Sequence, residues 1–144
     1  MKYILKSASI IGIVLMIVSC SSSKTTKTNT NFNNVLIGTW QICNSEGVVD
    51  NNLYGRTDET SYKIFSSEKF SVFSLHLVNR KVIKSFLGSY TADSKTITEY
   101  VEYRSNGYPR ISNQKYTYNY KIENGLLFIE GIDNLFKEVW KKIE

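Results

Sequence analysis

The chain has 144 residues, a formal net charge of +5 and a single histidine. One histidine excludes a site built from several histidines, and no cysteine–histidine spacing suits zinc, so we expect no metal and no cofactor. The lysines and arginines are scattered among acidic residues and form no basic stripe, which argues against nucleic-acid binding. Residues 35–144 are long enough for one domain with its own core.

The N-terminal segment predicts a signal peptide over residues 1–19. Lys2 and Lys6 supply a basic start, and Ala8 to Val18 supplies an apolar run. A spanning helix needs about 20 apolar residues, so this run is too short to cross a bilayer.

The segment at the end of this run, Ile17-Val18-Ser19-Cys20, resembles the lipobox of bacterial lipoproteins. The resemblance implies acylation of Cys20, with each buried methylene stabilising membrane attachment by about 0.8 kcal/mol. The expected location is the bacterial cell envelope, where the chain is lipid-anchored to the membrane. The expected membrane is the outer membrane. Its periplasmic face is favoured because Cys20 is not followed by an acidic run of the kind found in some lipoproteins that are exported to the cell exterior. The alternative is an ordinary cleaved signal with Cys20 near the site by chance.

Residues 20–34 are expected to form a disordered tether that begins at the lipidated cysteine. Ser21 to Asn34 is rich in Ser, Thr, Asn and Lys, so it cannot bury enough apolar area to offset its ordering entropy. Loss of Lys2 and Lys6 lowers the formal net charge to +3. Acylation of Cys20 leaves only Cys43, which excludes an internal disulfide.

Residues 35–144 show period-two alternation and almost no helical periodicity, which predicts an all-β domain. Asn79-Arg80, Asp93-Ser94 and Asn124-Gly125 suit tight hairpins, and Asn-Gly is the strongest of these signals. The longest connection, Gly47 to Asp58, is expected to fold over one end of the domain. We expect eight strands, at about 35–43, 59–66, 69–78, 81–91, 95–104, 114–123, 126–130 and 135–143.

The short connections favour an antiparallel up-and-down meander. Eight such strands can close into a barrel and so remove both exposed edges. A flat sheet or an immunoglobulin-like sandwich is the alternative, although a sandwich needs more crossing connections than these loops allow. The expected fold is therefore an eight-stranded antiparallel β-barrel.

Several segments of this domain, taken in order, resemble lipocalins and their calycin relatives. Gly38-Thr39-Trp40 resembles the lipocalin Gly-x-Trp signature. The later segments FLGSYTAD, TITEY, NGLLFIEG and KEVWKKI resemble a family of small bacterial lipocalin-like lipoproteins of uncharacterised function. In lipocalins the first-strand Trp closes one end of the barrel against a basic side chain from the last strands. The resemblance implies this closing role for Trp40, with Lys142 as the basic partner and Trp140 nearby.

Alternation along one strand predicts an inward face made of Ile97, Glu99, Val101 and Tyr103. A carboxylate on such a face must find hydrogen-bond donors or take up a proton. Glu99 is therefore either a polar anchor in a ligand cavity or a structural hub. As a hub it would bond a lysine or Tyr hydroxyls such as those of Tyr90 or Tyr118.

Aromatic side chains are expected to fill much of the interior, so any cavity should be small or shallow. Gly88 is the one inward position that leaves room. His76 is expected at a cavity edge or on the solvent face, and Cys43 as a buried apolar filler. No motif supports a Cys43–His76 nucleophilic pair. The aromatics assigned to inward faces are Trp40, Tyr62, Phe86, Tyr90, Tyr103 and Tyr118.

Two functions remain open. The first is a non-enzymatic, membrane-anchored barrel that binds a small, partly apolar ligand at its mouth. Its candidate lining residues are Glu99, Tyr90, Tyr103, Tyr118 and His76. The second is a module that contacts an unidentified protein or an envelope polymer around a filled interior. Interior volume discriminates between them, because a ligand site typically needs about 300 Å³ or more.

Overall fold

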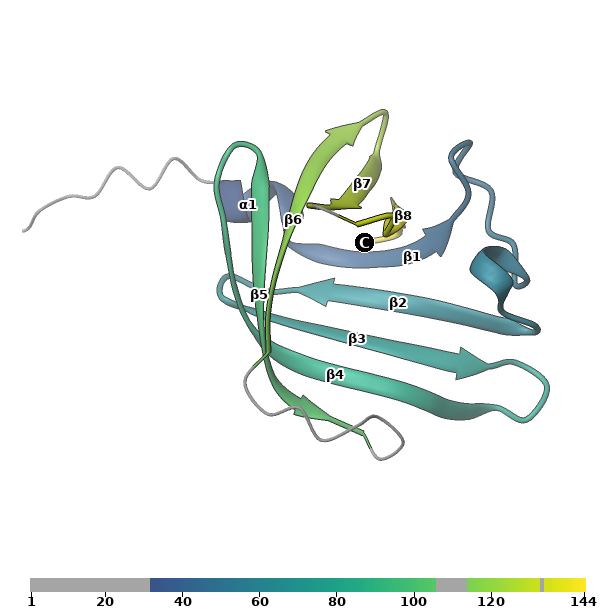
Figure 1. Cartoon of the computed structure of the whole chain (residues 1–144). Coiled ribbons are helices and arrows are strands. Elements are labelled where there is room, and N and C mark those ends of the chain that lie inside the picture. Colours follow the sequence, from purple (N-terminus) through teal and green to yellow (C-terminus); the bar gives the residue numbers. More distant parts are fainter. Residues whose placement is uncertain (1–31, 106–113, 133) are drawn as a thin grey trace, which may run out of the picture.

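Eight strands form one closed antiparallel barrel in the computed structural model, which describes residues 32–105, 114–132 and 134–144 (Figure 1). β1 pairs with both β2 and β8, so the described strands form a ring. The prediction of an all-β, eight-stranded up-and-down barrel is confirmed. The elements are α1 (Phe32–Leu36), β1 (Gly38–Cys43), the 3₁₀ turn η1 (Leu53–Gly55), β2 (Glu59–Phe65), β3 (Lys69–His76), β4 (Lys81–Ala92), β5 (Thr96–Arg104), β6 (Gln114–Glu123), β7 (Leu126–Gly131) and β8 (Lys137–Lys142).

The start of the domain differs from the prediction. A strand was expected from residue 35, but α1 occupies these positions and β1 begins at Gly38. Leu36 is fully buried, and the Nε1–H of Trp40 donates to its carbonyl oxygen at 2.7 Å. The predicted tether therefore ends too late, because residues 32–34 belong to α1. The predicted signal peptide, Cys20 and the rest of the tether lie outside the described residues.

The β6–β7 hairpin turns at Asn124-Gly125, as the sequence predicts. Asn124 and Gly125 have φ angles of 52° and 76°. A two-residue type I′ turn requires positive φ at both positions, and Asn-Gly adopts this conformation at little cost. The register that follows pairs Glu123 with Leu126.

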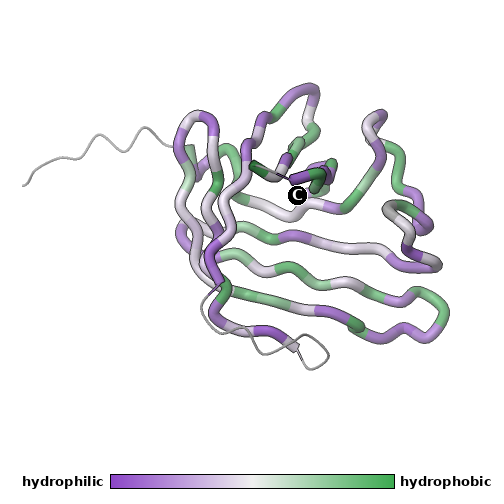
Figure 2. The backbone as a smooth tube through the Cα atoms, viewed as in Figure 1, coloured by the Kyte–Doolittle hydropathy of each residue, from purple (hydrophilic) through white to green (hydrophobic). Residues whose placement is uncertain are grey.

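The interior changes from apolar to charged along the barrel axis. Three successive inward rungs across β2, β3 and β4 show the change: Phe65, Phe70 and Gly88; then Lys63, Val72 and Phe86; then Ser61, Ser74 and Lys84. The first rung lies near α1, whose Asn33 donates to the Ser67 carbonyl oxygen in the β2–β3 turn. The hydropathy of successive residues changes repeatedly along these strands (Figure 2), as expected where alternate side chains face opposite sides of the sheet.

A β-bulge in β5 decides which side chains face the interior. The register with β4 shifts between Leu87 and Gly88, where β5 contributes Glu102 as an extra residue. The extra residue reverses the alternation, so Tyr103 is 66% exposed and Arg104 faces the interior. The predicted inward placement of Tyr103 is wrong, because alternation alone does not reveal a bulge.

Two further expectations about the interior are wrong. The ring of Tyr62 stacks on that of Phe73 with 5.4 Å between centroids, on the face of β2 opposite to Lys63. Gly88 leaves no free space, because a Cβ there would overlap the carbonyl oxygen of Tyr100. Close approach of two backbones accounts for this glycine.

We expect Gly88→Ala to lower the free energy of unfolding by about 1–3 kcal/mol, because the added methyl group must displace the backbone of β5. Thr91→Ala, at an exposed position of the same strand, is the matched control and should change it by less than about 0.5 kcal/mol. Urea unfolding followed by tryptophan fluorescence measures both. Equal stability of the two variants would contradict close packing of β4 on β5 here.

Candidate functional site

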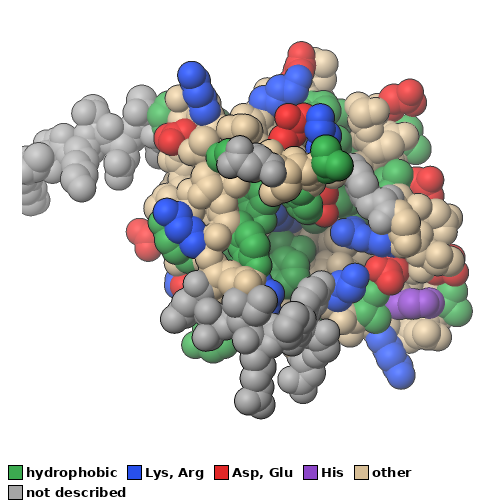
Figure 3. Space-filling model, in the orientation of Figure 1, with side chains coloured by type: hydrophobic (Ala, Val, Ile, Leu, Met, Phe, Trp, Pro, Cys, Tyr) green, Lys and Arg blue, Asp and Glu red, His purple; other side chains and the backbone are tan. Residues whose placement is uncertain are grey.

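The interior toward η1 contains two adjoining cavities. The central cavity has a volume of about 140 Å³ and is lined by Arg56 and by side chains from β2, β3, β4, β5, β6 and β8. The side cavity has a volume of about 170 Å³ and lies against β4, β5 and β6. Phe86, Glu99 and Tyr118 line both. In the space-filling view a hollow lined by hydrophobic side chains opens near the middle of the face drawn (Figure 3).

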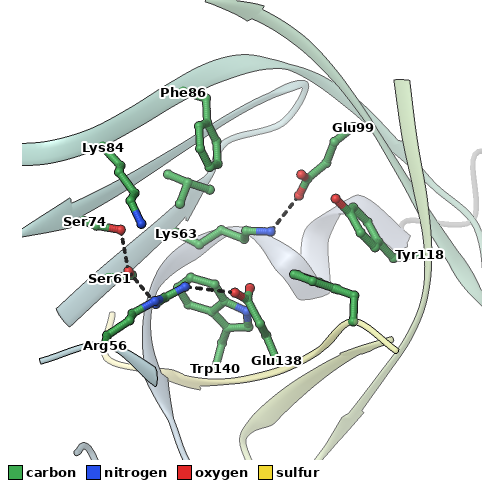
Figure 4. Close-up of a pocket in the computed structure, with 12 residues that line it drawn as sticks. Arg56, Ser61, Lys63, Ser74, Lys84, Phe86, Glu99, Tyr118, Glu138 and Trp140 are labelled. Atoms are coloured by element: carbon green, nitrogen blue, oxygen red, sulfur yellow. Dashed lines mark hydrogen bonds and ion pairs between the residues drawn. The ribbon is translucent and has the colours of Figure 1, made fainter. Parts of the chain in front are cut away.

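An ion pair lies at the centre of the central cavity (Figure 4). Lys63 Nζ lies 2.8 Å from Glu99 Oε1, and both side chains are 5% exposed. The same ammonium lies 5.3 Å from the ring centroid of Trp140 and 6.0 Å from that of Tyr118. Aromatic faces attract a cation, and the attraction is strongest where water is excluded. Each buried charge therefore has the partners that make its burial tolerable.

A second ion pair borders the cavity toward η1. Arg56 donates from Nη1 to Ser61 Oγ at 2.9 Å and from Nη2 to Glu138 Oε1 at 3.3 Å. The hydroxyl oxygen of Ser61 lies 2.7 Å from that of Ser74. Burial raises the pKa of the Glu138 carboxyl, while the nearby charges of Lys63 and Arg56 lower it. The long connection between β1 and β2 thus supplies one residue of the site.

The structure brings together only part of the predicted lining set. Glu99 and Tyr118 line both cavities. Tyr90 lies at the packed end, where its hydroxyl donates to a carbonyl oxygen in the β2–β3 turn at 2.7 Å. His76 lies at the end of β3, and its Nδ1 accepts a backbone N–H from the following turn. The prediction that Tyr90, His76 and Tyr103 line the ligand site is wrong for these two cavities.

The residues expected to close the barrel meet across the seam between β1 and β8. Trp40 pairs with Lys142 and Ile42 pairs with Trp140. Lys142 Nζ lies 5.5 Å from the ring centroid of Trp40. Both indoles are buried. The expected contact between the first-strand tryptophan and a basic side chain of the last strand is therefore present.

Sequence reasoning missed the cations of the interior. Lys63 and Lys84 line the central cavity and Arg104 lines the side cavity. One signal was available in β2: alternation backward from Phe65 selects Lys63 and not Tyr62. Hydropathy instead favoured the face of β2 that carries Tyr62, since lysine is rarely buried unless it is paired.

The described residues include neither a metal-binding cluster nor a membrane-spanning helix. Within that part of the chain, no group of three or more His, Cys, Asp or Glu side chains could hold a metal ion. The same residues include no helix long and apolar enough to cross a membrane. Burial raises the pKa of the Cys43 thiol, whereas a thiolate nucleophile needs a lowered pKa.

The sequence of residues 35–144 matches DUF4488, a domain of unknown function. The chain belongs to this family. The match extends from before β1 to beyond β8, so both cavities lie inside the DUF4488 domain. No curated protein and no solved structure matches the chain.

In this DUF4488 domain we expect Lys63→Met to lower the free energy of unfolding by about 3–5 kcal/mol, because it leaves Glu99 buried without its cation. Lys63→Met combined with Glu99→Leu removes both charges and should recover most of the loss. Lys121→Met, which breaks an exposed ion pair, is the control and should leave the unfolding midpoint nearly unchanged. Urea unfolding at neutral pH measures all three. A double variant as unstable as Lys63→Met would contradict the pairing argument.

Proposed function

We propose that this chain is a membrane-tethered, lipocalin-like binding protein that holds one small, partly apolar ligand inside its barrel without catalysing a reaction. The observation that carries the proposal is the pair of adjoining interior cavities, lined by aromatic and by charged side chains. Aromatic walls favour the hydrocarbon part of a ligand, and a few fixed polar groups orient its polar part.

The cavity volumes limit the size of the ligand. About 140 and 170 Å³ are below the roughly 300 Å³ of a typical ligand site. They are nevertheless larger than the voids of a close-packed interior, few of which exceed a water molecule. A ligand that spans both cavities past Phe86 has more room than either cavity offers alone. We therefore infer a small ligand, with its apolar part against the aromatic rings.

The arrangement of the polar groups supports binding more than catalysis. Glu99 is paired with Lys63, and Glu138 with Arg56. A catalytic nucleophile needs a base within hydrogen-bond reach. The hydrogen bond between Ser61 Oγ and Ser74 Oγ joins two hydroxyls and includes no base.

The lipocalin-like assignment rests on the sequence resemblance and on one contact, whereas the tether rests on the sequence alone. The stacking of Lys142 on Trp40 is the contact that the lipocalin resemblance implies. The lipobox-like segment ends at Cys20, and α1, where the described chain begins, lies at the packed end of the barrel (Figure 1). An anchor placed before α1 leaves the cavities accessible. We propose attachment to the cell envelope, with the periplasmic face of the outer membrane favoured.

A module that contacts a protein or an envelope polymer is the second candidate function. One observation favours it: a groove of about 330 Å³ at β6 and β7 is larger than either interior cavity. Asn119, Lys121 and Glu130 give this groove a polar lining. The groove and the interior use different side chains, so substitutions can separate the two functions.

Native mass spectrometry should detect a small molecule that co-purifies with the full-length protein from its own envelope. Phe86→Trp narrows both cavities and should reduce the bound fraction. Lys121→Gln changes only the outer groove and should leave the bound fraction unchanged. If the wild-type protein repeatedly carries no small molecule while Lys121→Gln abolishes retention of an envelope polymer, the second candidate replaces the first.

Cys20→Ser should move the protein from the membrane pellet to the soluble fraction, because it removes the acyl chains that would hold the protein at the bilayer. Cys43→Ser is the matched control and should remain in the pellet, since that thiol is buried in the barrel. Ultracentrifugation and immunoblotting of cell fractions measure both. A Cys20→Ser variant that still pellets with membranes means that the anchor is something else.

A further inference from the structure

The central cavity has one more cation than carboxylates. Its lining includes Arg56, Lys63 and Lys84, but only Glu99 and Glu138. Each carboxylate already pairs with one cation, Glu99 with Lys63 and Glu138 with Arg56. Among the residues that the structure describes, the ammonium of Lys84 makes no hydrogen bond or ion pair. Figure 4 shows this ammonium turned toward the cavity from β4, on the same side as Ser74.

The same cavity also has more hydrogen-bond donors than acceptors. Trp140 is 1% exposed, and its Nε1–H finds no acceptor in the described part of the chain. Trp40 is equally buried, but its Nε1–H donates to the Leu36 carbonyl oxygen. Burial raises the pKa of the Tyr118 hydroxyl, so this group stays protonated and able to donate. An ammonium and an indole N–H can only donate, so the missing groups are acceptors.

We propose that the ligand of the central cavity is a small monocarboxylate with a short apolar chain, and that Lys84 binds its carboxylate. The inference rests on the proposed binding function and names the chemical class of the ligand. One negative charge balances the ammonium of Lys84, whereas a phosphate dianion would leave the cavity with a net negative charge. Carboxylate oxygens only accept, which matches a lining rich in donors. Val72, Phe86 and Phe136 supply apolar wall for the hydrocarbon chain.

The test compares probes of equal length and different charge on the full-length protein. Isothermal titration calorimetry should show hexanoate binding about tenfold more tightly than hexanamide, because the amide loses the charge-assisted contact. Hexylamine should not bind, since its ammonium meets a cavity that already carries an excess cation. Inorganic phosphate should not displace hexanoate.

Substitutions at Lys84 test its assigned role. Lys84→Gln removes the charge and should abolish the preference for hexanoate over hexanamide, whereas Lys84→Arg should retain it. Lys81→Gln removes the same charge from an exposed position of the same strand and is the matched control, which should bind as the wild type does. Circular dichroism checks that the variants fold. A preference that survives Lys84→Gln would overturn the role of this residue.

The two tryptophans supply an internal control. In a proton–nitrogen spectrum, hexanoate should shift the indole signal of Trp140, which lines the cavity, and should leave that of Trp40 in place. Hexanamide or hexylamine binding as tightly as hexanoate would overturn the carboxylate assignment and leave the binding function intact. No binding of any probe would also overturn the assignment. The binding function itself fails only if the envelope-purified protein carries no small molecule.

Discussion

The ammonium of Lys63 is buried inside the barrel and must be neutralised by a side chain from a distant strand. Lys63 belongs to β2 and Glu99 to β5, so their 2.8 Å contact forms only when the intervening strands are paired in register and the sheet has curved. Trp140 reaches the same ammonium from β8, on the other side of the β1–β8 seam. A slip of one residue would turn Lys63 to the solvent face. Register, curvature and closure are therefore all required by one buried charge.

The packed end of the barrel offsets the cost of this charged interior. Leu36, Trp40 and Phe65 are almost completely buried near α1, and each such side chain contributes about 1.5–3 kcal/mol through removal of apolar surface from water. The rungs toward η1 bury hydroxyls and charges, which contribute little net stability. Stability is thus concentrated at one end, and the other end can keep cavities and incompletely satisfied polar groups.

The sequence predicted the barrel well because the strand pattern and the turn chemistry agree. Asn124-Gly125 adopts the turn that its residues favour, and alternation placed Glu99 inside between Ile97 and Val101. A lysine was one of the partners expected for Glu99, but Lys63 was not identified, because it lies 36 residues earlier and hydropathy assigns lysine to solvent. Charged side chains normally face solvent, and a buried ion pair is an exception for both residues at once. Hydropathy assigns neither residue to the interior until its partner is known. Lys84 lies two residues before Phe86 on β4 and shares its face, but its hydropathy is typical of a solvent-exposed residue.

Several of the remaining errors arise where the regular sheet is interrupted. The bulge at Glu102 exposes Tyr103 and turns Arg104 inward, and Arg56 reaches the cavity from a connection that has no periodicity. Two of these residues line a cavity: Arg56 lines the central cavity and Arg104 the side cavity. A side chain at the packed end needs only to fill space, so hydropathy describes it. A side chain that contacts a polar ligand or a neighbouring charge is determined by its partner and not by its own hydropathy. Prediction from hydropathy and strand alternation therefore fails first at such positions.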